Sequence, residues 1–446
     1  MSKFKEGLLI HLGDVTTMTR PILDINEKPT TPQWITLSFQ HMFAMFGATI
    51  LVPKLVGLSP SIALLTSGIA TIIFLLITQF KVPAYLGSSF AFIAPILIAS
   101  NGGENPGNAM IGALAVGITY GIVSLIIWKA GYKWLMRLLP PIVVAPVIMV
   151  IGLGLAGTAV DMAMNVEGEY NFLHFSAALV TLFSAIFFNV YFKNILSAMP
   201  VLLGLIVGYV YSSLIGIVDF SAVREASWFA MPEFLIPGIH YEFNITSTIL
   251  LAMVPIVFVT ISEHIGHQLV LGKIVNRNYI KDPGLHRSIV ADGLGTFVSA
   301  LVGGPPKTTY GENIGVLAIT RVYSVYVILG AAVIAILFSF VGKAMALIQT
   351  IPTAVLGGIS ILLFGIIASS GLRMLVDQKI DFGNNRNLVI SSVILVIGIG
   401  GAALEITEAF AIEGMALAAI IGVILNLVLP GRDKLTEEDF EEHHTA

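Results

Sequence analysis

The sequence predicts an all-α polytopic membrane protein, and its composition and hydropathy lead to this fold class. Of the 446 residues, 56% are hydrophobic and only 11% are charged, whereas a soluble domain carries about 25% charged residues. The mean hydropathy is +0.91, and many apolar runs approach the length of about 20 residues that a helix needs to cross a bilayer. The net charge of −4 gives no sign of a nucleic-acid partner, so we expect the lipid bilayer to surround the chain.

Fourteen apolar stretches follow one another along the chain. Residues 1–33 lack the apolar run of a cleavable signal peptide and are expected to form a cytoplasmic N-terminal segment. Residues 432–446 are acidic and polar and are expected to form a cytoplasmic tail. The charged stretch 217–243 divides the apolar stretches into two sets of seven. The stretches are 34–56, 59–79, 84–100, 106–128, 138–159, 172–192, 195–216, 246–272, 287–303, 308–320, 323–347, 350–370, 387–403 and 412–430.

The distribution of Lys and Arg predicts the orientation of these stretches. If the N-terminus is cytoplasmic and the stretches alternate in direction, all but four of the 23 basic residues lie on the cytoplasmic side. The exceptions are Lys54, Arg224, Lys307 and Lys343. Positive charge collects on the cytoplasmic side of membrane proteins. The sequence therefore predicts a multi-pass protein of the inner (cytoplasmic) membrane with both termini in the cytoplasm.

Two short stretches indicate where a substrate binds. With seven stretches in each half, the second half enters the membrane from the opposite side, which predicts an inverted repeat of the kind found in transporters. Stretches 84–100 and 308–320 are short, contain Gly or Pro, and occupy matching places in the two halves. Irregular backbone at membrane depth is tolerated only where it is buried in protein or faces a wet cavity. We therefore expect both stretches to line a binding site.

Two carboxylates are expected inside the membrane, where a charge is costly and usually functional. Glu312 lies in stretch 308–320, directly after Gly311. Glu263 and His267 are four residues apart in stretch 246–272, so they share one face of a helix. A carboxylate and an imidazole on one face can exchange a proton, which suits proton coupling. The alternative is a buried pair that only holds helices together.

A zinc site is the competing interpretation of the run from Glu263 to His267. The zinc-protease motif places two histidines four residues apart, whereas His264 and His267 are three apart and the chain has no cysteine. We therefore expect no metal and no other cofactor.

The interrupted stretches also indicate the chemistry of the ligand. The N-terminus of a half-helix offers free backbone N–H groups to carbonyl oxygens, and such ends are expected near Phe90 and at Gly311. The two carboxylates would accept hydrogen bonds from ring N–H groups. Phe90 either stacks on a planar ring or fills the core. This arrangement predicts a small, neutral, planar heterocycle.

Other polar residues in the apolar stretches are given structural roles. For Lys307 we favour a side chain that extends to the membrane interface over a pair with Glu312. Asp292 is expected to bond the nearby backbone, and His41 is expected to occupy a satisfied core position.

The run from Glu312 to Arg321, E-N-I-G-V-L-A-I-T-R, resembles the signature of the nucleobase–ascorbate transporters. That signature is an acidic or amide residue, Asn, one free position, Gly, four free positions, Thr and a basic residue. Further runs similar to this family lie at 40–49, 83–92, 263–267, 282–287 and 308–313. Within the family, the chain is most similar to members that import uracil with a proton.

The resemblance implies a fold of fourteen transmembrane segments in two inverted seven-segment repeats, with segments 3 and 10 interrupted by short antiparallel strands. It implies a core domain made of 34–130 and 246–348, and a gate domain made of 131–220 and 349–431 that also forms a homodimer. Residues 221–245 would form the extracytoplasmic connection between the two halves.

The resemblance also implies roles for individual residues. Glu263 and Glu312 would bind the ring nitrogens of uracil, and these two residues with His267 would handle the coupled proton. Backbone N–H groups near Phe90 and at Gly311 would bind the carbonyl oxygens. The remaining pocket residues would be Tyr310, which packs with Phe90 on the ring, and Ala48.

Two positions depart from the relative compared. Phe364 stands where that relative has Tyr, so a hydroxyl on the gate side is absent, which would lower affinity or alter closure. Lys307 stands where it has Asn, and a cation near Glu312 would shift the pH dependence of transport.

The sequence therefore predicts a secondary active transporter, not an enzyme, that imports uracil by movement of the core against the gate, with the proton as coupling ion. The first alternative is a xanthine or purine carrier on the same fold. Glu312 favours uracil, because purine members more often carry Gln there. An intramembrane metal-dependent enzyme and a channel are the remaining alternatives.

Overall fold

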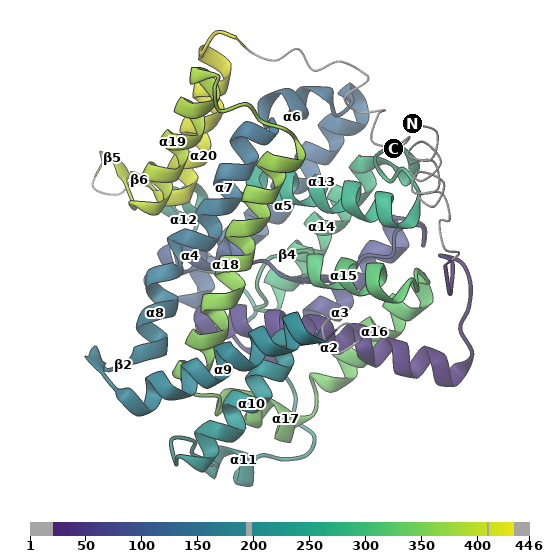
Figure 1. The fold of residues 1–446 in the computed structure, drawn as a ribbon, viewed down its shortest axis with the longest axis vertical. Helices are drawn as coiled ribbons and strands as arrows, with labels where there is room; N and C mark the ends of the chain where they lie inside the picture. Colours follow the sequence, from purple (N-terminus) through teal and green to yellow (C-terminus); the bar gives the residue numbers. More distant parts are fainter. Residues whose placement is uncertain (1–20, 193–198, 408–409, 432–446) are drawn as a thin grey trace, which may run out of the picture.

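The computed structural model describes residues 21–192, 199–407 and 410–431, which are mostly helical (Figure 1). Most of the predicted N-terminal segment and the whole predicted tail 432–446 lie outside the described residues. Among the described residues, seven helical spans are long and apolar enough to cross a membrane. They are α2 (Thr31–Leu55), α3 (Pro60–Ile77), α5 (Pro106–Ala130), α7 with α8 (Pro141–Gly154 and Ala156–Met164), α9 (Phe172–Tyr191), α12 with α13 (Ser247–Met253 and Ile256–Val275) and α18 (Thr353–Asp377).

Shorter elements complete the described chain. The short apolar helices are η1 with α4 (Phe90–Phe92 and Ile93–Ala99), α10 (Pro200–Leu214), α16 (Val325–Phe338), α19 (Asn385–Ile399) and α20 (Gly414–Val428). The other helices are α6 (Lys133–Leu138), α11 (Ser221–Glu225), η3 (Ile280–Gly284), α14 (Leu285–Leu301), α15 (Gly311–Thr320) and α17 (Gly342–Gln349). Two hairpins pair β2 (Asn165–Val166) with β3 (Glu169–Tyr170) and β5 (Ala403–Thr407) with β6 (Phe410–Glu413).

The helical content agrees with the predicted fold class, while the count of fourteen spans and the inverted repeat stay predictions. Some element ends differ from the apolar stretches. Helix α18 runs on to Asp377, beyond the predicted stretch 350–370, because hydropathy marks the part of a helix at lipid depth and not its end. The predicted stretch 323–347 is divided between α16 and α17.

The two interrupted stretches meet as a short two-stranded ribbon. Strand β1 (Leu86–Ser88) pairs antiparallel with β4 (Lys307–Thr309), with Gly87 opposite Thr308. Each strand runs into a half-helix: β1 into η1 and α4, and β4 into α15. A Cβ at Gly87 would overlap the ring of Tyr310, so only glycine fits at the middle of β1.

Hydroxyl groups satisfy the outer edges of this ribbon. On the β1 side, Thr71 of α3 accepts a hydrogen bond from the Leu86 N–H at 3.0 Å, and Ser67 of α3 donates to the Leu86 carbonyl. On the β4 side, Thr296 of α14 accepts from the Lys307 N–H at 3.0 Å and donates to the Lys307 carbonyl at 3.2 Å. An open strand edge in an apolar interior is costly unless its backbone groups are paired. The hydroxyls of α3 and α14 therefore make an isolated ribbon possible inside the bundle.

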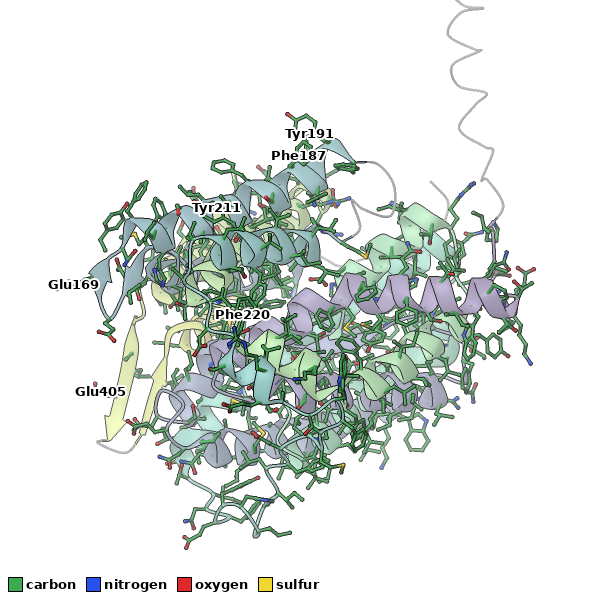
Figure 2. All side chains as sticks on the ribbon, turned by 90° about the horizontal axis from the view of Figure 1, so that it is seen from below. Glu169, Phe187, Tyr191, Tyr211, Phe220 and Glu405 are labelled. Atoms are coloured by element: carbon green, nitrogen blue, oxygen red, sulfur yellow. The ribbon has the colours of Figure 1, made fainter. Side chains whose placement is uncertain are left out.

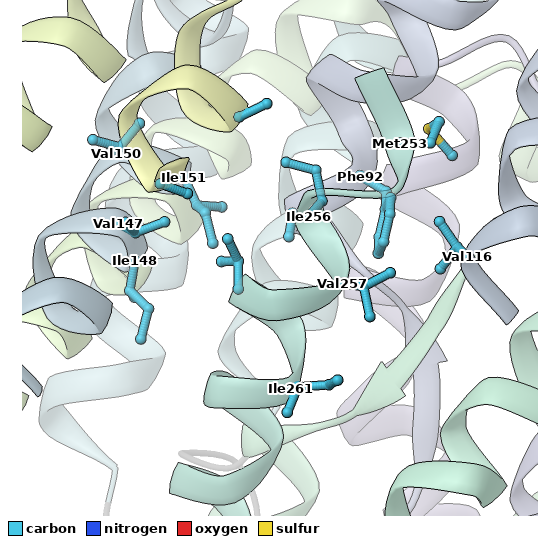
Figure 3. Packing of buried hydrophobic residues seen from close by; sticks show 14 of the residues in the cluster. Phe92, Val116, Val147, Ile148, Val150, Ile151, Met253, Ile256, Val257 and Ile261 are labelled. Atoms are coloured by element: carbon cyan, nitrogen blue, oxygen red, sulfur yellow. The ribbon is translucent and has the colours of Figure 1, made fainter. Parts of the chain in front are cut away.

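The helices pack in two sets. In one set, α14 packs on α5 and α3, and α16 packs on α2 and α3; in the other, α18 packs on α7, α8 and α9, and α19 packs on α20 and α7. Figure 3 shows Ile256, Val257 and Ile261 of α13 between two groups of apolar side chains. On one side are Phe92 and Val116, and on the other are Val147, Ile148, Val150 and Ile151 of α7. At the surface, Phe187 and Tyr191 of α9 point outward (Figure 2), as expected of side chains that face lipid.

Candidate functional site

The ribbon and its half-helices place the first candidate carboxylate. Tyr310 is extended and caps α15, so Glu312 lies in the first turn of that helix. Glu312 is half-buried, and the preceding Gly311 is exposed. The first backbone N–H groups of a helix lack partners within the helix. The N-terminus of α15 therefore offers N–H donors beside a carboxylate acceptor.

The second candidate carboxylate lies on the neighbouring helix α13. Glu263 and His267 are both half-buried and lie on one face, as predicted, and α13 packs against α15. Glu263 and Glu312 lie close enough to interact electrostatically. Thr260, one turn before Glu263, is fully buried, accepts a hydrogen bond from the Tyr120 hydroxyl and donates to the Ile256 carbonyl at 3.1 Å. The hydrogen bonds of Thr260 therefore serve helix packing, and Glu263 is the group on this face that interacts with Glu312.

His267 lies between the ribbon and the start of α15. Its Nδ1 is 3.2 Å from Oγ1 of Thr309, the last residue of β4. At its other end, Nε2 would lie 3.3 Å from a Cβ built on Gly311. The imidazole therefore reaches from the ribbon to the exposed glycine, and the structure brings Glu263, His267, Gly311 and Glu312 together.

Tyr310 and Ala48 are buried, with 3% and 1% of their surface exposed. The Tyr310 hydroxyl donates to the Ser88 carbonyl at 2.8 Å and accepts from Thr49 at 3.4 Å. These bonds tie the end of β1 to the start of α15 and to α2. The ring-stacking role predicted for Tyr310 stays a prediction, and its visible contacts hold the ribbon in shape.

Phe90 lies at the start of the other half-helix and is half-buried. Its ring meets the ring of Phe364 of α18 edge-on, with centroids 6.4 Å apart and planes at 84°. Phe90 also borders a mainly apolar cavity of about 240 Å³ between the two helix sets. Residues around this cavity include Ala94, Val150, Ile256, Gly398 and Met415. Phe90 therefore packs against Phe364 and presents apolar surface to this cavity.

The interpretation of Lys307 as a side chain that extends to the membrane interface is wrong. Lys307 is fully buried, and its Nζ donates to the Ala63 carbonyl of α3 at 3.0 Å. The reason is its place on β4, which lies inside the bundle, so the side chain points across to α3 and not along a helix toward water. No ion pair of Lys307 with Glu312 is found among the described residues.

Sequence reasoning also missed a buried pair behind the site. Asp292 of α14 and His264 of α13 are both fully buried, with Oδ2 and Nδ1 2.8 Å apart. From the sequence alone, Asp292 is expected to bond the nearby backbone, and His264 enters only through the competing zinc interpretation. The available signal was that two neighbouring apolar stretches each carry an ionisable residue without an obvious partner. His41 has the core role expected: it accepts a hydrogen bond from Asn313 through its backbone carbonyl at 3.1 Å.

The part of the chain that the structure describes contains no group of three or more His, Cys, Asp or Glu side chains that could hold a metal ion. The groups that the structure does bring together are the carboxylates of Glu263 and Glu312, the imidazole of His267 and the first backbone N–H groups of α15.

Comparisons with known proteins agree with this arrangement. A family model described as the permease family matches residues 32–407. A uracil permease of Bacillus caldolyticus is 65% identical over 429 residues, which cover 96% of this chain and 99% of that protein. A uracil permease of Bacillus subtilis is 57% identical over 95% of this chain and 98% of its own length. A uracil permease of Escherichia coli is 46% identical over 92% of this chain and 94% of its own length.

Solved structures support the fold alone. The transmembrane domain of a cyanobacterial bicarbonate transporter is similar with a TM-score of 0.60 and 14% identity, over 88% of this chain and 96% of that one. A murine anion transporter of solute carrier family 26, in the inward-facing state, is similar with a TM-score of 0.65 and 12% identity, over 96% of this chain and 72% of that one.

Proposed function

The chain belongs to the permease family, whose members are membrane transporters and not enzymes, and on this premise we propose that it imports uracil with a proton across the cytoplasmic membrane. The observation that carries the choice of substrate is the near-full-length similarity to three uracil permeases at 46–65% identity. The pairing of Glu263 with Glu312 beside the start of α15 supports the same choice on chemical grounds.

Uracil is flat and neutral and carries two ring N–H donors and two carbonyl acceptors. In our proposal, the carboxylates of Glu263 and Glu312 accept the ring N–H groups. Backbone N–H groups at Gly311 and near Phe90 donate to the carbonyl oxygens, because both positions begin half-helices. The ring of Phe90 packs on the base, and Tyr310 and Ala48 complete the wall. Each polar edge of the base then meets a group of opposite hydrogen-bonding character.

The two carboxylates give a physical reason for coupling uracil transport to a proton. Two negative charges that are half-buried and close to each other repel strongly in a medium of low polarity. A proton on one of them removes that repulsion and leaves the other free to accept an N–H of uracil. We therefore propose that a proton and uracil enter the site together, with Glu263, Glu312 and His267 as the groups that handle the proton.

We propose that movement divides the chain into a core (34–130 and 246–348) and a gate (131–220 and 349–431). In this proposal fourteen segments in two inverted repeats place both termini in the cytoplasm, and the gate forms a homodimer. The separate packing of α14 on α5 and of α18 on α7 supports this division. The hydroxyl caps that α3 and α14 give to opposite edges of the ribbon fit an inverted repeat.

Uptake of labelled uracil by purified protein in liposomes tests this function. We expect saturable uptake that depends on an inward proton gradient and that unlabelled uracil inhibits more strongly than xanthine or cytosine. Stronger inhibition by xanthine would indicate that the natural substrate is a purine and not uracil. Uptake that does not depend on the proton gradient would refute proton coupling. An uptake rate that does not saturate with uracil concentration would indicate a channel.

A further inference from the structure

A line of buried polar groups lies behind the candidate site. It begins at Asp292 of α14, whose Oδ2 is 2.8 Å from Nδ1 of His264, and neither side chain is exposed. Oγ1 of Thr309 lies 3.4 Å from the same Nδ1 and 3.2 Å from Nδ1 of His267. Three elements, α14, α13 and β4, therefore connect a buried carboxylate to the imidazole at the site.

The hydrogen-bonding capacities of these groups decide where the protons lie. An ionised carboxylate has only lone pairs and repels the lone pair of a nitrogen 2.8 Å away, so Nδ1 of His264 is the nitrogen that carries the proton, although the contact is an ion-pair distance and not a well-aligned hydrogen bond. Nε2 of His264 is buried and has no hydrogen-bond partner among the described residues. A buried N–H without a partner is costly, which again favours the proton on Nδ1.

The same reasoning extends to His267 through Thr309. Because Nδ1 of His264 is a donor, it cannot accept a hydrogen bond from the Thr309 hydroxyl. That hydroxyl is then free to donate to Nδ1 of His267 at 3.2 Å. A neutral imidazole that accepts at one nitrogen carries its proton on the other. His267 therefore carries its proton on Nε2, the nitrogen beside Gly311.

We propose that Asp292, His264 and Thr309 are positioning residues that hold His267 in its Nε2–H form, so that His267 presents a hydrogen-bond donor to the site. His264 of α13 is the titratable group that interacts directly with His267. Glu263, on the same helix face, interacts with Asp292 of α14 and Glu312 of α15, and Tyr120 of α5 interacts with Asp292 and Glu263. The acceptors at the site are Glu263 and Glu312, and Glu312 directly follows the exposed Gly311. The coupled proton then resides on a carboxylate, while His267 acts as donor to a carboxylate or to a carbonyl of the base.

The proposal rests on the proposed function for the identity of the acceptor, but the protonation form of His267 is measurable without transport. Nitrogen-15 NMR of histidine-labelled protein in lipid at neutral pH distinguishes the two neutral forms and the imidazolium, and loss of a signal in His267→Gln assigns it. We expect the Nε2–H form in the native protein and in Thr309→Ser. Thr309→Val, which keeps the shape and removes the hydroxyl, should populate the Nδ1–H form.

A matched control is Thr78→Val, because the Thr78 hydroxyl is also buried and, among the described residues, bonds to the Phe74 and Leu75 carbonyls at the end of α3 and not to the site. It should leave His267 unchanged. In uptake assays, Thr309→Val should raise KM for uracil about three- to tenfold, the effect of one hydrogen bond, and Thr309→Ser should restore it.

An Nδ1–H or doubly protonated His267 in the native protein would overturn the proposal. An unchanged form in Thr309→Val would overturn it as well. If Thr309→Val does not fold, the native protein and Thr309→Ser still decide the question. An Nε2–H form in a protein that does not take up uracil would refute the proposed function and leave this inference intact.

Discussion

Gly87→Ala tests whether the ribbon and its contact with Tyr310 hold the site together. A Cβ at Gly87 would fall within the Tyr310 ring, so the ring would have to move. Moving the ring breaks the hydrogen bond from its hydroxyl to the Ser88 carbonyl at 2.8 Å and the weaker one from Thr49 at 3.4 Å. Overpacking in a dense interior costs about 1–3 kcal/mol, and each lost hydrogen bond costs about 1 kcal/mol. We therefore expect a loss of about 3–5 kcal/mol in stability.

The assay is the thermal stability of the detergent-solubilised protein, read together with uracil uptake. Gly87→Ala should lower the apparent Tm and abolish uptake, because displacement of Tyr310 also displaces the start of α15. Gly121→Ala is the matched control, because a Cβ there has nothing within 4 Å and α5 is helical at that position. That control should leave stability unchanged or raise it slightly.

A double-mutant comparison isolates the overlap itself. In a Tyr310→Ala background the ring is gone, so adding Gly87→Ala should change stability little, although Tyr310→Ala alone is costly. The two substitutions should therefore be strongly non-additive. Equal costs of Gly87→Ala in both backgrounds, or no cost in the native background, would refute the reasoning.

Three further predictions concern single side chains. Glu263→Gln and Glu312→Gln should each reduce proton-driven uptake by more than tenfold, because each replaces a charged acceptor for a ring N–H with a weaker neutral one and removes a site for the proton. Normal proton-driven uptake in both variants would refute the mechanism. Phe364→Tyr should change the apparent affinity for uracil with little loss of protein stability, since Phe364 meets Phe90 across the two helix sets; an unchanged KM would show that this position does not affect binding. Lys307→Met should maintain or raise the apparent Tm, because it removes a buried cation whose described partner is a neutral carbonyl, and a large drop in Tm would show that the ammonium is needed.

The sequence predicted the broken elements well, because the signals that break them are local. Pro83 and the pair Pro305–Pro306 lie just before the two strands, where they disfavour helix, and glycines follow within a few residues. Glu312 directly follows Gly311, so the break at this glycine predicts a carboxylate at the start of a half-helix. The structure has Glu312 in the first turn of α15. The i,i+4 spacing of Glu263 and His267 set their common face without any tertiary information.

The direction of side chains on the ribbon could not be predicted from the sequence. A three-residue strand has no periodicity to show which face is buried, and its side chains alternate with register. The pairing of Ser88 with Lys307 fixes that register, and it turns the Lys307 side chain toward α3. The pair of His264 with Asp292 could not be predicted for a related reason. His264 lies on the face of α13 away from the site, and the helix that packs against that face depends on contacts between segments distant in sequence.

The chemical contrast between the two helix sets explains how a site of this kind can move. The polar groups at the site lie on α13, β4 and α15, and the ribbon beneath them is capped by hydroxyls of α3 and α14. Across from them, the described contacts are apolar: Phe364 meets Phe90, and Val147 to Ile151 of α7 pack near Ile256 and Val257. Sliding one apolar surface over another exchanges similar contacts and breaks no hydrogen bond, so its cost is small. In the proposed mechanism, a polar pocket built within one set would therefore move with its ligand, and the opposite set would only have to present a surface that does not bind the ligand.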